Sequence, residues 1–373
     1  MYDIAIIGAG INGCSMAAEF LRENKNVIIF DKEGVASGGS GAAGAFISPK
    51  FSKAGELKAV IEEAFLYSME YYEKYFPQYF TKAQLLHIAK NADEDEILRI
   101  FKDRTTLNLE EIDATVKKSI MPEAAKRESV SLNAGIVDAK NICRMMIDGA
   151  KFVQLHVENI VYEDDYWIID DTYTAKELIL ATGAYKTLLH EPYIQLRGVW
   201  GHRIDVKTET KNPYSIHQFV SISPSSNGLL AVGATHNVHY HPETSSESYN
   251  IEEGRSELLE KVARTLKLEN IEIVKDYMGL RSGSFDYMPL VGPLVLSHET
   301  LACCEKKIRV KKPNYKEFLY YPHLNMINGS GGYGFVLAPY LARILKEHIL
   351  EAKEISDRIT PARFFARWAK KRS

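Results

Sequence analysis

Two short apolar runs near the N-terminus predict two buried parallel strands with a helix between them. Residues 4–7 form the first run and residues 26–30 contain the second, while residues 14–24 between them have a helix-like pattern. Uninterrupted apolar runs of this length are typical of strands that are covered on both faces. The pattern therefore predicts a β-α-β unit and an α/β fold.

Two later segments repeat this combination of an apolar run and a glycine turn. Residues 178–181 indicate another buried strand, which ends at Thr182 and Gly183. The glycine-rich stretch 328–334 precedes an apolar, helix-like segment over residues 335–350. A helix that begins after such a turn directs its partly positive N-terminus at an electron-rich group.

A glycine motif follows the first predicted strand directly and reads Gly8-Ala9-Gly10-Ile11-Asn12-Gly13. In such a motif the first glycine makes a tight turn, the second admits a pyrophosphate, and the third lets helix and strand pack closely. Asp31 ends the second strand, where a carboxylate can accept hydrogen bonds from ribose hydroxyls. Strand, glycines, helix, strand and acid in this order predict a dinucleotide-binding unit.

A second loop of small residues, 34–44, favours FAD over a nicotinamide as the dinucleotide. Nicotinamide dehydrogenases usually start another helix at this point, whereas small residues let the backbone lie against a flat ring. A flexible linker is the alternative, but the loop continues without a break into residues 45–49. Beyond the first motif and Asp31, the expected cofactor contacts are Lys32, Ser37, Gly38, Gly44, Ala45, Thr182, Gly183, Gly331, Gly332 and Gly334.

Composition narrows the class of protein. With 373 residues, of which 46% are apolar, the chain can bury a sizeable core, and two domains are expected. The formal net charge of −3 excludes a generally basic surface. Four cysteines without metal-site spacing indicate a reducing, cytoplasmic location. No apolar stretch reaches the roughly 20 residues that span a bilayer, and no signal peptide is expected.

Together these motifs resemble the FAD-dependent amine oxidoreductases, the family that includes D-amino-acid oxidase, glycine oxidase and sarcosine oxidase. The matching segments are residues 8–13 with Asp31, 36–44, 180–183, 279–283 with 286–292, and 329–339. The resemblance implies noncovalent FAD in a discontinuous Rossmann-like domain, covered by a mixed-sheet α+β substrate domain. It assigns residues 1–55, 130–190 and 279–373 to the FAD-binding domain, and residues 56–129 and 191–278 to the substrate domain.

A narrower resemblance concerns the FAD oxidoreductase half of MnmC, a bifunctional tRNA-modifying enzyme. Residues 36–38, 44–49, 52–53 and 361–367 carry it. The resemblance implies removal of the carboxymethyl group from carboxymethylaminomethyl-uridine at the tRNA wobble position, with release of glyoxylate and without the methyltransferase step. Oxidation of glycine, sarcosine or a D-amino acid is the alternative activity. A flavoprotein without turnover is a third alternative, which the complete set of glycine loops disfavours.

Arg281 is the expected substrate-binding and catalytic residue, because the resemblance places the family's carboxylate-binding arginine there. A guanidinium grips a carboxylate with two parallel hydrogen bonds, which lysine cannot reproduce. A surface ion pair is the alternative role for Arg281. Tyr333 and Tyr287 could add hydroxyl groups to the substrate site. In the family, a basic residue is common at the position of Tyr333. Lys53 is expected to contact the substrate or the flavin edge, unless it is solvated.

Histidines give a weaker signal. His236, His239 and His241 match a metal site in spacing alone, so no metal is expected. In members of the family, the segment that corresponds to the one with His202 lies along the edge of the active site. A structural role for His202 is the simpler interpretation.

Local basic segments make tRNA a plausible partner. A tRNA would dock on them through salt-dependent phosphate contacts, and its wobble uridine would have to turn out of the anticodon loop into an open-sided pocket. The alternative is a tail that packs its aromatic side chains on the body. Oligomeric state is left open, with a monomer plausible. The two segments are residues 306–312 and a tail with Arg363, Phe364, Phe365, Arg367, Trp368, Lys370, Lys371 and Arg372.

Overall fold

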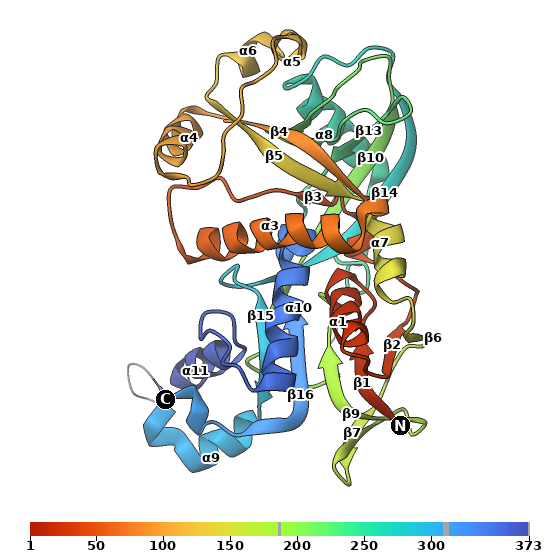
Figure 1. Cartoon of the computed structure of the whole chain (residues 1–373), viewed down its shortest axis with the longest axis vertical. Coiled ribbons are helices and arrows are strands. Elements are labelled where there is room, and N and C mark those ends of the chain that lie inside the picture. Colours follow the sequence, from red (N-terminus) through yellow and green to blue (C-terminus); the bar gives the residue numbers. More distant parts are fainter. Residues whose placement is uncertain (186–187, 309–312, 372–373) are drawn as a thin grey trace.

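The computed structural model describes residues 1–185, 188–308 and 313–371. Within these residues the strands form two eight-stranded mixed sheets, one in each half of the elongated molecule (Figure 1). The chain passes between the halves several times, so each sheet collects strands that lie far apart in the sequence. The predicted α/β fold, with a Rossmann-like unit and a second mixed sheet, is confirmed.

The first sheet is built around the N-terminal strand β1 (Tyr2–Ile7), which pairs in parallel with β2 (Val27–Asp31) and β9 (Tyr173–Leu180). β1 therefore lies in the middle of the sheet, where a continuous apolar run is favoured. The path continues beyond β2 to β6 (Lys151–Gln154) and beyond β9 to β16 (Tyr320–Asn328) and β15 (Leu290–Val295). A hairpin of β7 (Ile160–Glu163) and β8 (Tyr166–Ile169) joins this sheet through β9.

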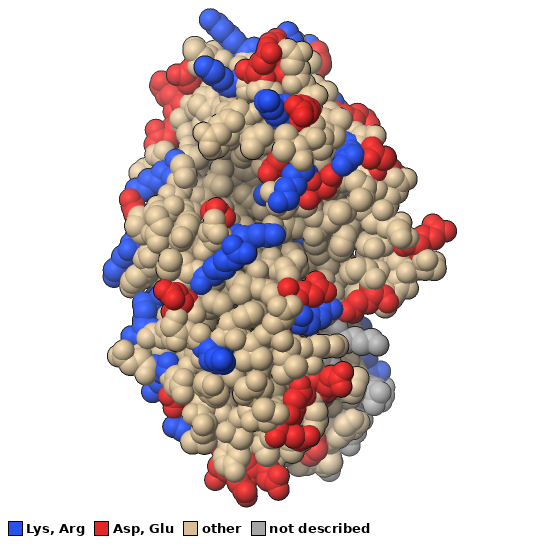
Figure 2. Space-filling view, turned by 90° about the vertical axis from the view of Figure 1, so that its right-hand side faces the viewer, with Lys and Arg blue, Asp and Glu red and all other residues tan. Residues whose placement is uncertain are grey.

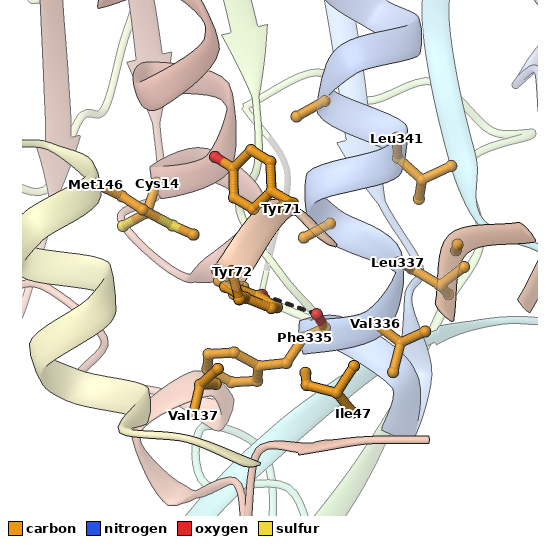
Figure 3. Close-up of a cluster of buried hydrophobic side chains, with 14 of the residues drawn as sticks. Cys14, Ile47, Tyr71, Tyr72, Val137, Met146, Phe335, Val336, Leu337 and Leu341 are labelled. Carbon is orange, nitrogen blue, oxygen red and sulfur yellow. Dashed lines mark hydrogen bonds between the residues drawn. The ribbon is translucent and has the colours of Figure 1, made fainter. Parts of the chain in front are cut away.

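Alternate residues of β1 face two different hydrophobic cores. Ile4 and Ile6 belong to the cluster that includes residues of α1 (Ile11–Arg22), whereas Ala5 and Ile7 belong to a second cluster on the other face. Besides α1, the first cluster includes side chains of the helices α3 (Glu56–Tyr75), α7 (Ala139–Met146) and α10 (Gly334–Glu351), among others. Figure 3 shows their side chains converging, with the Tyr72 hydroxyl donating to the Phe335 carbonyl at 2.8 Å. This core fixes the start of α10 relative to α1.

The second sheet forms the other half of the molecule, and α8 (Ile251–Ala263) packs against it. β4 and β11 pair in parallel, and the other neighbouring strands are antiparallel. Its order is β14 (Glu272–Ser284), β10 (Leu196–Lys207), β13 (Leu229–Gly233), β12 (Ser221–Ile222), β11 (Ser215–His217), β4 (Phe80–Ile88), β5 (Ser129–Val137) and β3 (Phe46–Ile47). The helices α4 (Ala92–Arg104), α5 (Ala114–Ser119) and α6 (Pro122–Ala125) lie at its outer end (Figure 1).

Sheet membership differs in three places from the ranges expected for the domains. β3, β5 and the end of β14 pair within the second sheet, although residues 1–55, 130–190 and 279–373 were expected in the FAD-binding domain. Long-range pairing determines the sheet to which β5 belongs, because β5 pairs with β3 and β4, which come from earlier segments of the chain. The domain ranges themselves remain a prediction.

The C-terminal tail packs on the body of the protein. In α11 (Ala362–Lys371) the side chains of Phe364 and Phe365 are buried in the second core, and Arg363 is only 8% exposed. The tail therefore packs its aromatic side chains on the body, which was the alternative to RNA contact, and Arg363 is occupied by an ion pair with Asp286. Residues 309–312 and Arg372 of the basic segments lie outside the described residues, as do the side chains of Lys306 and Lys307.

No helix among the described residues is long and apolar enough to cross a membrane. In the same part of the chain, no three histidine, cysteine, aspartate or glutamate side chains are grouped as a metal ion would require.

Candidate cofactor and substrate site

Residues from both sheets line one cavity of about 1030 Å³. That volume is at the upper end of typical small-molecule sites, which span about 300–1,000 Å³. The glycine turn after β1, the loop that contains the short helix α2 (Gly39–Ala42), the end of β9 and the turn before α10 contribute from one side. Strands β11, β13 and β14 contribute from the other.

The turn between β1 and α1 is tight enough to require glycine. Gly8 has a φ of +106°, and a Cβ there would lie 2.3 Å from the Ala181 carbonyl oxygen. A Cβ on Gly13 would lie 1.9 Å from the Gly8 oxygen, so α1 packs directly against the end of β1. Gly10 instead faces the cavity, where a Cβ would meet only the Ser40 hydroxyl, at 3.1 Å. The N-terminus of α1 thus opens on a space that a phosphate could enter.

Asp31 ties this turn to the next loop. Its carboxylate accepts hydrogen bonds from the backbone N–H groups of Ala9 at 2.9 Å, Glu33 at 3.0 Å and Gly34 at 3.1 Å, and from the Ser37 hydroxyl at 3.3 Å. The neighbouring Lys32 pairs with Glu243 at 2.9 Å and lies over the ring of Tyr185. Both Asp31 and Lys32 line the cavity, where a ribose would meet them.

The small-residue loop packs against the strand that carries Arg281. A Cβ on Gly39 would lie 2.6 Å from the Leu280 oxygen, and one on Gly279 would lie 2.8 Å from the Gly39 Cα. The Ser40 hydroxyl accepts a hydrogen bond from the Ile11 N–H at 2.9 Å. Small side chains here therefore allow three elements to meet around one cavity, rather than forming a flexible linker.

Two later segments complete this side of the cavity. The Ser330 hydroxyl donates to the Asn12 side chain at 3.0 Å, which joins the last glycine loop to the first. Thr182 lines the cavity, and its buried hydroxyl has no hydrogen-bond partner among the described residues. The helix α10 begins at Gly334 beside Ile11, so the N-termini of α1 and α10 both face this space.

This donor set fits an extended dinucleotide, with space for a pyrophosphate at the N-terminus of α1 and further backbone N–H groups at the N-terminus of α10. Ala9 and Gly13 lie behind the cavity wall and shape the turn. The other expected cofactor residues line the cavity itself: Gly8, Gly10, Ile11, Asn12, Asp31, Lys32, Ser37, Gly38, Gly44, Ala45, Thr182, Gly183, Gly331, Gly332 and Gly334.

Arg281 projects from β14 into the same cavity. Its Nη2 donates to the Thr235 carbonyl at 3.1 Å, and Gly201 on the adjacent strand leaves the space that the guanidinium fills. Burial lowers the pKa of Arg281. Within the described part of the chain, no carboxylate pairs with it. A partly buried guanidinium without a counter-charge is suited to bind an anionic group with its remaining N–H donors.

His202 supports the segment that contacts Arg281. It is fully buried, and its Nε2 hydrogen-bonds to Asp276 at 2.9 Å. Its backbone N–H donates to the Thr235 hydroxyl at 3.0 Å, so the segment that accepts the Arg281 hydrogen bond is held in place. The structural interpretation of His202 agrees with this position.

Tyr333 lines the cavity next to the α10 N-terminus. Burial raises the pKa of its hydroxyl to about 12, so the hydroxyl remains a neutral donor at physiological pH. The ammonium of Lys50 lies 5.8 Å from the centroid of the Tyr333 ring, and burial lowers the pKa of Lys50.

Lys53 is not brought into the cavity. Its ammonium pairs with Glu96 at 2.8 Å on the surface, so the expectation of a cofactor or substrate contact is not supported by its position. Phe46, at the start of β3, and Ser48 line the cavity, and β3 is held there by its pairing with β5. The chain has reached the protein surface by Lys53. Tyr287 also lies outside the cavity wall and is 61% exposed.

Three further residues, Phe46, Arg203 and His217, line the cavity and were not expected as site residues. The ring of His217 meets Phe46 edge-on at 5.0 Å, and its buried Nε2 has no hydrogen-bond partner among the described residues. Behind it, His87 stacks on Phe51 at 4.2 Å. Burial lowers the pKa of His217 to about 4 and that of His87 to about 3, so both are neutral at pH 7.

These two histidines predict a loss of stability in acid. Because their folded-state pKa values lie below the usual unfolded value of about 6.5, the stabilisation is present above pH 6.5 and lost as pH falls toward 4. Each should cost up to about 2 kcal/mol between pH 7 and pH 5. Urea unfolding of His87→Phe should show a smaller drop than wild type, whereas the exposed control His239→Gln should not. An equal drop in wild type and His87→Phe would contradict this assignment.

Comparison with known proteins agrees with the geometry of the cavity. The sequence model of the family described as FAD dependent oxidoreductase matches residues 3–348. The tRNA 5-methylaminomethyl-2-thiouridine biosynthesis bifunctional protein MnmC of Legionella pneumophila (strain Corby) is 24% identical over 392 residues, which cover 96% of this chain and 56% of that protein. The chain thus spans about half the length of the curated relatives it matches.

Solved structures share the fold at lower identity. Glycine oxidase from Bacillus cereus ATCC 14579 superposes with a TM-score of 0.73 at 20% identity, covering 95% of this chain and 96% of that one. Iminodiacetate oxidase from Chelativorans sp. BNC1 has a TM-score of 0.71 at 16% identity, covering 96% and 98%.

Proposed function

Because this chain belongs to the FAD dependent oxidoreductase family, we propose that it removes the carboxymethyl group of carboxymethylaminomethyl-uridine at the tRNA wobble position. The products would be aminomethyl-uridine and glyoxylate. The MnmC relatives match 96% of this chain, and their name places them in the biosynthesis of 5-methylaminomethyl-2-thiouridine in tRNA. A tRNA substrate would also place the enzyme in the cytoplasm.

The observation that carries the proposed oxidation of an N–CH₂–COO⁻ group is the partly buried Arg281 guanidinium, which has no carboxylate partner among the described residues. The N–CH₂–COO⁻ group of the substrate would supply that partner. Two parallel charge-assisted hydrogen bonds would fix the carboxylate and hold the adjacent methylene at one place in the cavity. The Thr235 carbonyl, which accepts from Nη2 at 3.1 Å, holds the guanidinium in this orientation.

Bound FAD would supply the oxidation, by accepting a hydride from that methylene. Gly8, Gly10 and the N-terminus of α1 would hold its pyrophosphate, and the N-terminus of α10 would lie near its ring. Hydrolysis of the substrate imine would then release glyoxylate. Tyr333 would donate a hydrogen bond to the substrate or the ring edge, because its raised pKa keeps the proton on the hydroxyl. We expect the FAD to be noncovalent and to be released intact by acid.

A small N-carboxymethyl amine or amino acid is the second candidate substrate. The structural neighbours named glycine oxidase and iminodiacetate oxidase favour it, although at these identities they share only the fold. Arg281 would bind the same carboxylate in either case.

Anaerobic flavin bleaching separates the two substrates. We expect tRNA that carries carboxymethylaminomethyl-uridine to reduce the bound FAD rapidly and, in air, to yield aminomethyl-uridine on nucleoside analysis. Free sarcosine, glycine and iminodiacetate should react slowly or not at all. Rapid bleaching by one of these amines, with tRNA inert, would establish the second candidate instead.

A further inference from the structure

We propose that Phe285 and Tyr287 form a stacking surface for unpaired bases of the tRNA anticodon loop, just outside the cavity that holds Arg281. This inference rests on the proposed function, because it concerns how the same site would receive its RNA.

The first observation is exposure. Phe285 is 55% exposed and Tyr287 is 61% exposed, and no other phenylalanine, tyrosine or tryptophan that the structure describes is as exposed. Both residues lie in the turn between β14 and β15, two positions apart. Isolated exposed apolar residues need no explanation, but an exposed aromatic pair indicates a contact surface.

The second observation is the rigidity of the turn. Asp286, between the two aromatic residues, accepts two hydrogen bonds from the guanidinium of Arg363, both at 3.0 Å. It also accepts from the Ser284 hydroxyl at 3.0 Å and the Met288 N–H at 3.2 Å. Burial raises the pKa of Asp286, but the hydrogen bonds and positive charge of Arg363 have the larger combined effect, so the pKa of this carboxyl is lowered. The aromatic rings therefore project from an anchored carboxylate.

Backbone conformation supports the same conclusion. Tyr287 has a φ of +64°, which is uncommon for a residue other than glycine and is strained for a bulky one. The anchored Asp286 and the buried Arg363 hold the turn in this conformation. A preorganised aromatic surface loses little conformational freedom when a ligand stacks on it.

The third observation is the position of the turn. It follows β14, which carries Arg281, and Gly283 on that strand forms a β-bridge with the cavity residue Ser330. Arg197 pairs with Gly283 across the strands, and its guanidinium lies 5.2 Å from the centroid of the Tyr287 ring. A base stacked at this turn would lie beside the cavity that would receive the wobble nucleotide.

The fourth observation is charge. The Arg197 guanidinium lies over the Tyr287 ring, and the half-exposed Arg367 lies 3.5 Å from Asp286. These two guanidinium groups at the turn complement a phosphate backbone. On the face shown in Figure 2, basic and acidic side chains are interspersed, so RNA contact would depend on a local set of this kind.

This combination matches the physics of single-stranded RNA. Unpaired loop bases are commonly recognised by stacking on aromatic side chains, with arginines tracking the backbone. A small amine that is enclosed with the flavin would need no aromatic surface outside the cavity. A second copy of this chain could also cover such a surface, and the experiment below distinguishes it.

The test measures binding of a fluorescent tRNA anticodon stem-loop with an unmodified wobble uridine to the FAD-loaded protein. Phe285→Ala and Tyr287→Ala should each weaken binding by about 5- to 150-fold. Phe285→Tyr and Tyr287→Phe should retain affinity, whereas Phe285→Leu should not, because stacking requires a ring. The matched control is Tyr75→Ala, which removes an exposed tyrosine at the end of α3. Arg197→Gln should lower the salt dependence by about one unit of slope.

Several outcomes decide the proposal, with flavin content confirming that each variant is folded. Unchanged RNA affinity in both alanine variants, or no RNA binding by the wild type, would overturn it. It would also be overturned if the alanine variants convert a dimer to a monomer and leave RNA binding intact. If the wild type binds the stem-loop through these rings but leaves the modified uridine intact in tRNA, the proposed function fails and the stacking surface stands.

Discussion

Arg281→Ala should reduce kcat/KM for the modified tRNA by about 30- to several-thousand-fold, because it removes a buried charge-assisted pair with the substrate carboxylate. Arg281→Lys should be nearly as impaired, since an ammonium retains the charge but lacks the planar pair of donors. The absorption spectrum of the bound flavin should change little, because the guanidinium is proposed to hold substrate rather than cofactor. Steady-state kinetics and flavin content on the same preparations measure both effects.

The control for this experiment is Arg99→Ala, which removes an exposed arginine that pairs with Glu128. It should retain wild-type activity. Thermal unfolding of Arg281→Ala distinguishes a substrate effect from collapse of the site, since the Thr235 carbonyl loses its donor. Wild-type activity in Arg281→Ala would place the carboxylate site elsewhere in the cavity.

The glycine loops were predictable because their constraints are local. Gly13 is required by its close contact with Gly8, and Gly8 by its φ of +106°, so both constraints lie within a single strand-turn-helix unit. The further contact of Gly8 with the Ala181 carbonyl comes from a distant strand. Asp31 was predictable for the same reason, since it ends the next strand. Its use as an acceptor for four protein donors was not, because those donors come from two separate loops.

Long-range packing decided what the sequence left open. Lys50 and Lys53 are three residues apart, and only the pairing of β3 with β5 places the first near Tyr333 and the second at the surface. The tail pattern indicated an amphipathic helix but not its partner. Its burial depends on a core built from β9, β15 and β16.

His217 shows a different limit. It lies in the three-residue strand β11, too short for a periodic pattern, and its environment depends on Phe46 from a distant segment. The exposure of Phe285 and Tyr287 likewise depends on the pairing of Asp286 with Arg363, 77 residues further along the chain. Neither the environment of His217 nor the exposure of these two aromatic residues can be predicted without knowing which strands and helices pack together.

Gly10→Val should abolish retention of FAD, and with it all oxidase activity. Gly10 lines the cavity at the N-terminus of α1, so a side chain there would occupy the place of the pyrophosphate. Inserting this bulk at a close contact should weaken FAD binding on the order of 100-fold or more. The measurement is the flavin-to-protein absorbance ratio after gel filtration, followed by titration of the apoprotein with FAD.

A second variant distinguishes occlusion of the cavity from a local clash. The nearest atom to a Cβ on Gly10 is the Ser40 hydroxyl, at 3.1 Å, and that hydroxyl also accepts the Ile11 N–H. Ser40→Ala alone should keep most of its FAD, while the double variant Gly10→Val with Ser40→Ala should remain colourless, because relief of the clash leaves the side chain in the phosphate space. Gly10→Ala should lie between the wild type and Gly10→Val, because a single methyl group intrudes less. Normal flavin content in Gly10→Val would show that the pyrophosphate does not lie against this turn, and recovery of FAD in the double variant would attribute the loss to Ser40 instead.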